Sequence, residues 1–172
     1  TQKKIYCYEP QKIFFRSLVK LKKKYNFLVL FNFGLGSQNK YESVYYPYIN
    51  FFKKKFTLFA YSFPEKKDLE EQISLDFIIR PKIFKEKIII KKFKLPNKKI
   101  HLVKIDTNGS EFNIIGSIMP ILKRDKPVLI IENNNINKIY KKIKFLNYKK
   151  FCVNDKKLVK HVNQKNVNII FK

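Results

Sequence analysis

The segment Lys104-Ile105-Asp106-Thr107-Asn108-Gly109 places a carboxylate between an apolar run and a helical pattern. Leu102-Val103 precedes it, and Ser110-Glu111-Phe112 follows it. Open α/β sheets build their sites where a strand ends in a polar residue and turns into a helix. Asp106 is therefore a candidate for catalysis or binding. The simpler interpretation is that an aspartate is favoured near the start of a helix.

Two further acidic residues follow runs that predict strands. Glu9 and Pro10 come directly after the run 5–8, and Glu132 comes directly after the continuous apolar run 128–131. The carboxyl ends of parallel strands meet at one edge of a sheet. We therefore expect Glu9, Asp106 and Glu132 to converge on a common rim.

Helical periodicity separates these runs. Three sets of apolar residues recur at spacings of three and four, which predicts amphipathic helices. Pro120 should break the second helix, at Ile118 or Met119. The three sets are Phe14, Leu18, Leu21 and Tyr25; Phe112, Ile115, Met119 and Leu122; and Ile136, Ile139, Ile143 and Leu146.

Strands that alternate with helices in this way predict an α/β fold with a doubly wound, mostly parallel sheet. A further strand over 27–33 ends at Gly34-Leu35-Gly36, where glycine allows a turn or a close approach of the backbone to a ligand. Neither the run 148–153 nor the run 167–171 has helical periodicity. They predict an antiparallel hairpin at the end of the chain.

The stretch from about 38 to 97 is too long for an ordinary loop, which predicts a hairpin-containing insertion or a substrate lid. It contains a strand-like run over 88–90 and many tyrosines and phenylalanines interleaved with lysines. Such rings could stack on bases or sugars. We favour the interpretation that they are core residues whose lysine neighbours extend to solvent.

The composition predicts one globular domain over residues 1–172, because 45% of the chain is hydrophobic and 16% is aromatic. The formal charge is +25. Arg16, Arg80 and Arg124 are the only arginines among 38 basic residues, whereas bidentate contacts to phosphate and guanine favour arginine. We therefore expect no specific nucleic-acid partner, although this charge attracts polyanions and acidic membranes nonspecifically.

Cys7 and Cys152 lie in separate apolar runs and predict buried free thiols. Together with His101 and His161 they have no metal-ligand spacing, so we expect no metal site. No apolar run is long enough to span a bilayer or to form a signal peptide, which favours a cytoplasmic location. Because Thr1 leads almost directly into a strand, we expect further chain upstream.

Several of these segments together resemble the FkbM family of S-adenosylmethionine-dependent methyltransferases. Tyr8-Glu9-Pro10 is similar to its F-E-P signature, and Lys104 to Glu111 is similar to its K-I-D-x-E-G-x-E signature. Ile130-Ile131-Glu132, Asn32 to Ser37 and Leu146 to Phe151 also resemble family segments. The resemblance spans nearly the whole chain apart from residues 38–97.

The resemblance implies a class I, Rossmann-like methyltransferase sheet with an antiparallel last strand, and S-adenosylmethionine as the cofactor. It implies that Glu9, with Pro10, holds the ribose hydroxyls, and that Asn32 and Gly34 lie near the adenine. Asp106 would face the methionine end of the cofactor and the substrate hydroxyl, as a general base or an electrostatic orienter. Glu111 and Glu132 would be secondary carboxylates, with Glu132 contacting substrate or accepting a proton.

The chain departs from the family pattern in two places. Asn108 stands where the family has glutamate, and no Gly-rich loop is found among these residues. The sequence begins at what the resemblance implies is the second strand, so we expect this segment alone to bind cofactor weakly or not at all.

The function these features imply is O-methylation of a saccharide or a small hydroxylated metabolite. One alternative is a noncatalytic binding module that holds an acidic glycan or another polyanion. The other is a lysine-rich nucleic-acid-binding protein.

Overall fold

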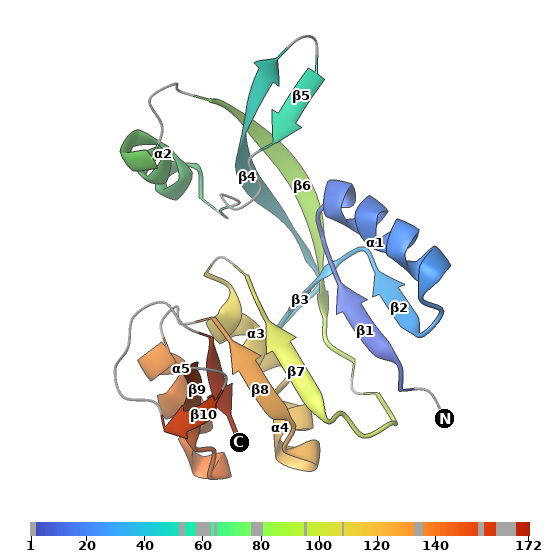
Figure 1. Ribbon diagram of the computed structural model, residues 1–172, viewed down its shortest axis with the longest axis vertical. Coiled ribbons are helices and arrows are strands. Elements are labelled where there is room, and N and C mark those ends of the chain that lie inside the picture. Colours follow the sequence, from blue (N-terminus) through green and yellow to red (C-terminus); the bar gives the residue numbers. More distant parts are fainter. Residues whose placement is uncertain are drawn as a thin grey trace. The chain divides into compact units, whose positions relative to one another are not determined.

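The structure is a computed structural model, drawn in Figure 1 with its helices and strands labelled. Contacts within the chain divide it into two compact units, Thr1–Lys92 and Phe93–Lys172. Each unit is described by itself, and the prediction of one domain over 1–172 stays a prediction. The described residues are 3–51, 54–57, 63, 65–76, 81–94, 96–107, 109–132, 136–154, 157–160 and 168–172.

The first unit begins with two parallel strands joined by a helix, as predicted. These elements are β1 (Ile5–Tyr8), α1 (Lys12–Lys24) and β2 (Leu28–Phe31). Strand β2 ends earlier than the predicted range 27–33. Pro10 lies one residue before the N-cap Gln11, so α1 begins just after this proline.

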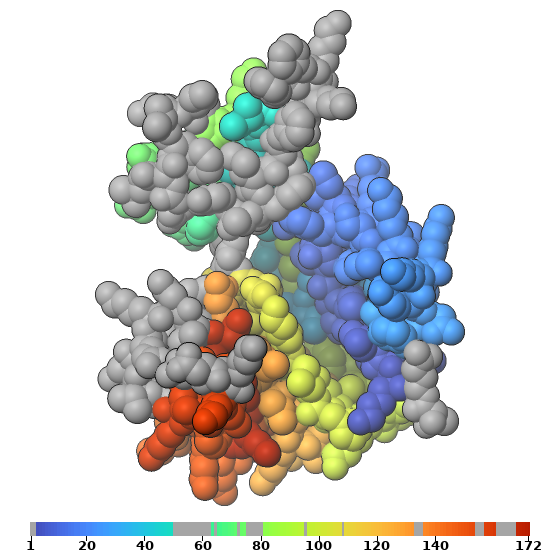
Figure 2. Space-filling model, viewed as in Figure 1, coloured from blue at the N-terminus to red at the C-terminus, as the bar shows by residue number. Residues whose placement is uncertain are grey.

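Helix α1 lies at the surface of its unit. None of its residues is buried, and Leu21 is 46% exposed. In Figure 2 the side chains of α1, in mid-blue, lie at the surface of this unit. The helix ends in three lysines, a favourable position for cations because the helix dipole is negative there.

The described part of the stretch from 38 to 97 contains three strands and a helix. Its strands β4 (Lys40–Phe51) and β6 (Lys82–Lys92) pair antiparallel over most of their length. Strand β5 (Lys54–Thr57) extends the sheet beside β4, and helix α2 (Lys66–Asp76) precedes β6. The consecutive strands β4 and β5 are antiparallel, as a hairpin requires, and the run 88–90 lies in β6. That this stretch is an insertion or a substrate lid stays a prediction.

Gly34 and Gly36 belong to a strand rather than to the expected turn. They lie in β3 (Gly34–Gly36), which pairs parallel with β6. A Cβ atom on Gly34 would lie 2.7 Å from Cδ1 of Ile90, and one on Gly36 would lie 2.5 Å from Cγ2 of Ile90. The close approach that these glycines allow is therefore to a core side chain.

The aromatic residues of β4 divide between the two faces of the strand. Tyr46 is 5% exposed and shares its face with the buried Ile88 and Ile90, whereas Tyr41 is 66% exposed on the opposite face. The interpretation that these rings are core residues therefore holds for Tyr46 and is wrong for Tyr41.

The second unit begins with the predicted strand, broken helix and strand. Strand β7 (Leu102–Ile105) leads into α3 (Glu111–Ser117) and α4 (Met119–Asp125), and β8 (Val128–Ile131) pairs parallel with β7. The two helices meet at Ile118, so the predicted break is confirmed. Pro120 lies in the first turn of α4, where it lacks only an N–H that would have no partner within the helix.

The rest of this unit completes a mixed sheet. Helix α5 (Ile136–Ile143) continues into η2 (Lys144–Leu146), and all four of the predicted apolar residues here are buried. Strands β9 (Lys150–Asn154), β10 (Lys157–Lys160) and β11 (Ile169–Phe171) follow.

The five-stranded sheet has the order β10-β9-β11-β8-β7. Only β7 and β8 are parallel in this sheet. The sheet is therefore mixed, whereas we expected a mostly parallel one. The last strand is antiparallel to its neighbours, as predicted, whereas β10 was not predicted. Neither Cys7 nor Cys152 forms a disulfide within the described part of the chain; Cys152 is fully buried, whereas Cys7 is half-buried.

Candidate active site

Asp106 and Glu132 follow two neighbouring parallel strands. Ile105, the last residue of β7, pairs with Ile131, the last residue of β8. The backbone N–H of Glu132 donates to the carbonyl oxygen of Ile105 at 3.4 Å, which continues the pairing past the end of β8. The two carboxylates therefore lie at the same edge of the sheet, as the sequence predicted for this pair.

Lys104 is a third charged residue at this edge. Its Nζ atom lies 2.6 Å from Oδ2 of Asp106, and both side chains are more than half exposed. Residues two apart on a strand point to the same side, which brings the ammonium group to the carboxylate. An exposed ion pair of this kind contributes little stability, so its main effect is on the local charge.

The pKa of Glu132 is raised above its ordinary value of 4.5. Burial is the largest cause, followed by the negative charges of Asp106 and Glu111, while Lys104 acts in the opposite direction. Acidic side chains with such raised pKa values can accept a proton more readily near neutral pH. Glu132 thus has the environment expected of a general base.

Glu111 is the most buried acid described, with 1% of its surface exposed. Its Oε1 atom accepts hydrogen bonds from Oγ1 of Thr107 at 2.9 Å and from the backbone N–H of Gly109 at 3.3 Å. Gly109 has a φ of +92°, a conformation that side chains disfavour. Glu111 therefore ties together the loop that follows Asp106, which suits a positioning residue.

Glu9 lies at the end of β1 in the first unit. Its backbone N–H donates to the carbonyl oxygen of Phe31, and its Oε1 atom accepts a hydrogen bond from the N–H of Gln11 at 2.8 Å. Burial raises the pKa of Glu9 and so does the charge of Glu86, whereas the bond from Gln11 lowers it. The described residues donate a hydrogen bond to Oε1 of the Glu9 carboxylate and none to its Oε2 atom.

Asn32 fastens the turn that holds Glu9. Its side-chain amide nitrogen donates to the carbonyl oxygens of Glu9 at 2.9 Å and Pro10 at 3.3 Å. A Cβ atom on Gly34 would lie 3.5 Å from Cγ of Pro10, so Gly34 also packs against this turn. The predicted cofactor residues Glu9, Pro10, Asn32 and Gly34 are therefore brought together within this unit.

Aromatic rings lie next to this group. The ring of Tyr8, the residue before Glu9, stacks on Phe31 with centroids 4.8 Å apart and meets the edge of Phe33 at 5.7 Å. All three side chains are half-buried. They form an apolar surface against which a planar ring could pack.

A sequence model of the Methyltransferase FkbM domain matches residues 1–150 of this chain. The chain belongs to the FkbM methyltransferase domain family. The fold is also similar to the crystal structure of methyltransferase FkbM from Methylobacillus flagellatus KT, with a TM-score of 0.60 and 12% sequence identity. The similarity covers 99% of this chain and 36% of that one, so the present chain spans about a third of its length. No curated protein matches the sequence.

Sequence reasoning gave no role to three residues that contact or influence the candidate site residues of this FkbM-family chain. Lys104 and Thr107 could have been found, because one lies two residues from Asp106 on a strand and the other lies four residues from Glu111. Glu86 gave no local signal, because it approaches Glu9 and the start of α1 from a distant strand. Its Oε1 atom accepts a hydrogen bond from the N–H of Lys12 at 3.0 Å.

The described residues bear on two other expectations. No group of three or more His, Cys, Asp or Glu side chains in the described ranges could hold a metal ion. Across the same ranges, no helix has the length and apolar character needed to cross a membrane. Glu9 lies in one unit and Asp106, Glu111 and Glu132 in the other, so the convergence of these acids stays a prediction.

Proposed function

We propose that this chain forms part of an S-adenosylmethionine-dependent O-methyltransferase that acts on a saccharide or a small hydroxylated metabolite. The observation that carries the proposal is the pair Asp106 and Glu132, at adjacent strand ends in a chain of the FkbM family. The raised pKa of Glu132 suits a group that takes the proton of the acceptor hydroxyl.

The two acids of this pair suit different roles. Asp106 is paired with Lys104, and its negative charge is one cause of the raised pKa of Glu132. We assign proton acceptance to Glu132 and electrostatic orientation to Asp106. Glu111 acts through the loop that it holds, so it is a positioning residue rather than a catalytic one.

The chemistry of the first unit fits part of the proposed cofactor. Glu9 offers a carboxylate oxygen that can accept hydrogen bonds from the ribose hydroxyls. Asn32 and Pro10 fix the turn that carries Glu9, and the ring of Tyr8, which stacks on Phe31, supplies an apolar surface for adenine. When bound, S-adenosylmethionine supplies an electrophilic methyl group. The protein aligns the acceptor hydroxyl and takes its proton.

The test measures methyl transfer from labelled S-adenosylmethionine by the intact protein across a panel of saccharides and small alcohols. Glu132→Gln should lower kcat by about 10²-fold or more, because the proton acceptor is lost. Glu9→Gln should mainly weaken cofactor binding, by about tenfold. Asp68→Asn, on the exposed surface of α2, is the matched control and should leave both quantities unchanged.

Two results would overturn the proposal. One is a folded protein that, at its full natural length, binds no S-adenosylmethionine in calorimetry. The other is full activity in Glu132→Gln and in Asp106→Asn, which would place the chemistry elsewhere in the protein.

A further inference from the structure

Three lysines on one face of β6 each lie over an aromatic ring of a neighbouring segment. The Nζ atoms of Lys87 and Lys85 lie 4.2 Å and 5.7 Å from the ring centroids of Tyr41 and Tyr45. Lys91 lies 4.8 Å from the ring of Phe33 in the same way. Positions 85, 87 and 91 share one face because side chains alternate along a strand.

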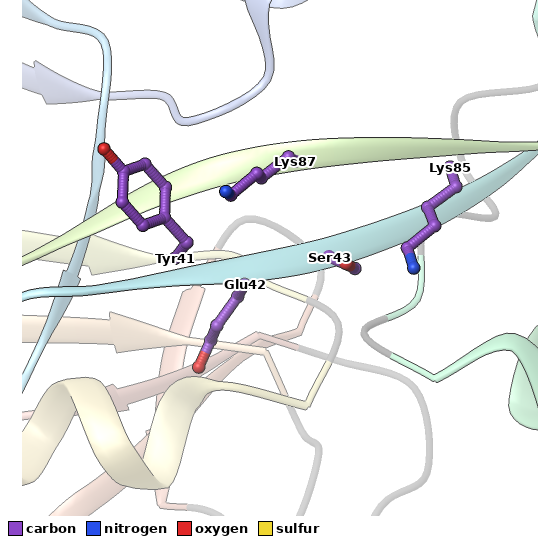
Figure 3. Close-up of a pocket in the computed structure, with 5 residues that line it drawn as sticks. All are labelled: Tyr41, Glu42, Ser43, Lys85 and Lys87. Carbon is purple, nitrogen blue, oxygen red and sulfur yellow. The ribbon is translucent and has the colours of Figure 1, made fainter.

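A shallow pocket of about 400 Å³ opens on this part of the paired strands β4 and β6 (Figure 3). It is lined by Tyr41, Glu42, Ser43, Lys85 and Lys87. Ser43 lies directly opposite Lys87 in the antiparallel pairing, and Figure 3 shows Lys87 extending toward Tyr41. The pocket therefore combines two ammonium groups, two hydroxyl groups and an exposed ring.

The charge of this pocket is positive. Glu42 is its only acidic lining residue, and its carboxylate forms an ion pair with Lys40. Glu86, which lies between the two pocket lysines in sequence, points to the other face of β6 and accepts a hydrogen bond from Lys12. No ion pair involves Lys85 or Lys87 among the residues that the structure describes.

We propose that this pocket, formed by Tyr41, Ser43, Lys85 and Lys87, binds a saccharide that carries carboxylate or phosphate groups. The rings hold the lysine ammonium groups in place, so less side-chain freedom is lost when an anion binds. The hydroxyls of Tyr41 and Ser43 can exchange hydrogen bonds with sugar hydroxyls. The inference goes beyond the proposed methyl transfer and does not depend on it.

The same features favour a saccharide over a nucleic acid. Single-stranded nucleic acids bind mainly by stacking their bases on aromatic faces. Here the ring of Tyr41 already carries the ammonium group of Lys87.

The experiment titrates the intact protein with trigalacturonate by calorimetry at physiological ionic strength. A phosphorylated trisaccharide is titrated in parallel, and the tighter of the two identifies the preferred anionic group. The methyl ester of trigalacturonate keeps the sugar hydroxyls but removes the charges, and it should bind at least about tenfold more weakly. The double variant Lys85→Gln/Lys87→Gln should lose at least about tenfold in affinity for the acid form.

A matched control separates the pocket from the general charge of the protein. Lys20→Gln/Lys22→Gln removes the same charge from the exposed surface of α1 and should change the affinity less than about twofold. Ser43→Ala should weaken binding while leaving the charge unchanged. Circular dichroism melting curves establish that each variant is folded.

Four results would overturn the proposal. They are failure of both anionic saccharides to bind, equal binding of the methyl ester, equal loss in the α1 control, and tighter binding of decathymidylate than of either saccharide. None of these results bears on methyl transfer, so the two proposals fail separately.

Discussion

Asp106 and Glu132 lie at the ends of adjacent parallel strands, and the negative charge of Asp106 helps to raise the pKa of Glu132. Asp106→Asn should therefore lower the pKa of Glu132, and Lys104→Gln should raise it, because Lys104 acts in the opposite direction. Carboxyl chemical shifts followed by NMR across a pH series measure both changes. Shifts of the same sign in the two variants would contradict this account.

The same pair predicts a pH dependence of stability. Because folding raises the pKa of Glu132, its contribution to stability is fully present below the ordinary value of 4.5 and is lost as pH rises through the folded value. In Asp106→Asn, less stability should be lost as pH rises, because the pKa of Glu132 is raised less. Urea unfolding at pH 4 and pH 7 should therefore show a smaller difference in the variant than in the parent, and an unchanged difference would refute the coupling.

Alanine substitutions at Gly34 and Gly36 should destabilise the protein to different extents, because each would meet a different atom of Ile90. Alanine at Gly36 would meet Cγ2, close to the rigid branch point of Ile90, and should destabilise the protein by about 1–3 kcal/mol. Alanine at Gly34 would meet only the terminal Cδ1 atom and should cost less.

Ile90→Val supplies the control for this pair, because valine lacks Cδ1 and keeps Cγ2. A double-mutant cycle by urea unfolding should show that Ile90→Val relieves much of the cost of Gly34→Ala and little of the cost of Gly36→Ala. Equal relief at both positions would show that the contacts are not as the structure places them.

Glu111 should contribute more to stability than to chemistry. Glu111→Ala leaves the hydroxyl of Thr107 and the N–H of Gly109 without their acceptor and should cost about 2–3 kcal/mol. Glu111→Gln retains an acceptor oxygen and should cost less. The exposed Glu71→Ala is the control for urea unfolding, and equal losses in the alanine and glutamine variants would count against the positioning role.

Asp125 should contribute stability that is lost in acid. Hydrogen bonds from Arg124 and from the N–H of Ile100 lower the pKa of Asp125 from 3.8 to about 2. A lowered pKa gives stability that is present above the ordinary value and is lost as pH falls toward the folded value. The stability difference between the parent and Asp125→Asn should thus shrink below about pH 4, and a difference that grows there would contradict the assignment.

Local patterns predicted much of this fold. The break at Pro120, the buried face of Ile136, Ile139 and Ile143, and the strand ends at Asp106 and Glu132 all follow from periodicity and strand order. Each of these features depends on residues close together in the sequence or on one parallel pair of strands.

The features that sequence analysis missed depend on distant pairing. The contacts of Gly34 and Gly36 with Ile90 exist because β3 pairs with β6, and no pattern near the glycines indicates that partner. The side-chain amide of Asn32 donates hydrogen bonds to the carbonyl oxygens of Glu9 and Pro10. The spacing of these residues in the sequence does not indicate this contact. The mixed sheet of the second unit likewise reflects where β11 inserts, between β8 and β9.

The hydrogen bond between Lys12 and Glu86 spans 74 residues of sequence. Helix α1 has no acidic residue in its first turn and no side-chain bond at its N-cap, so the acceptor for this N–H comes from β6. During synthesis, α1 leaves the ribosome well before β6 is made. The first turn of the nascent helix should therefore fray until β6 pairs with β4. Completion of α1, an early element of the chain, is thus linked to one of the later steps of folding.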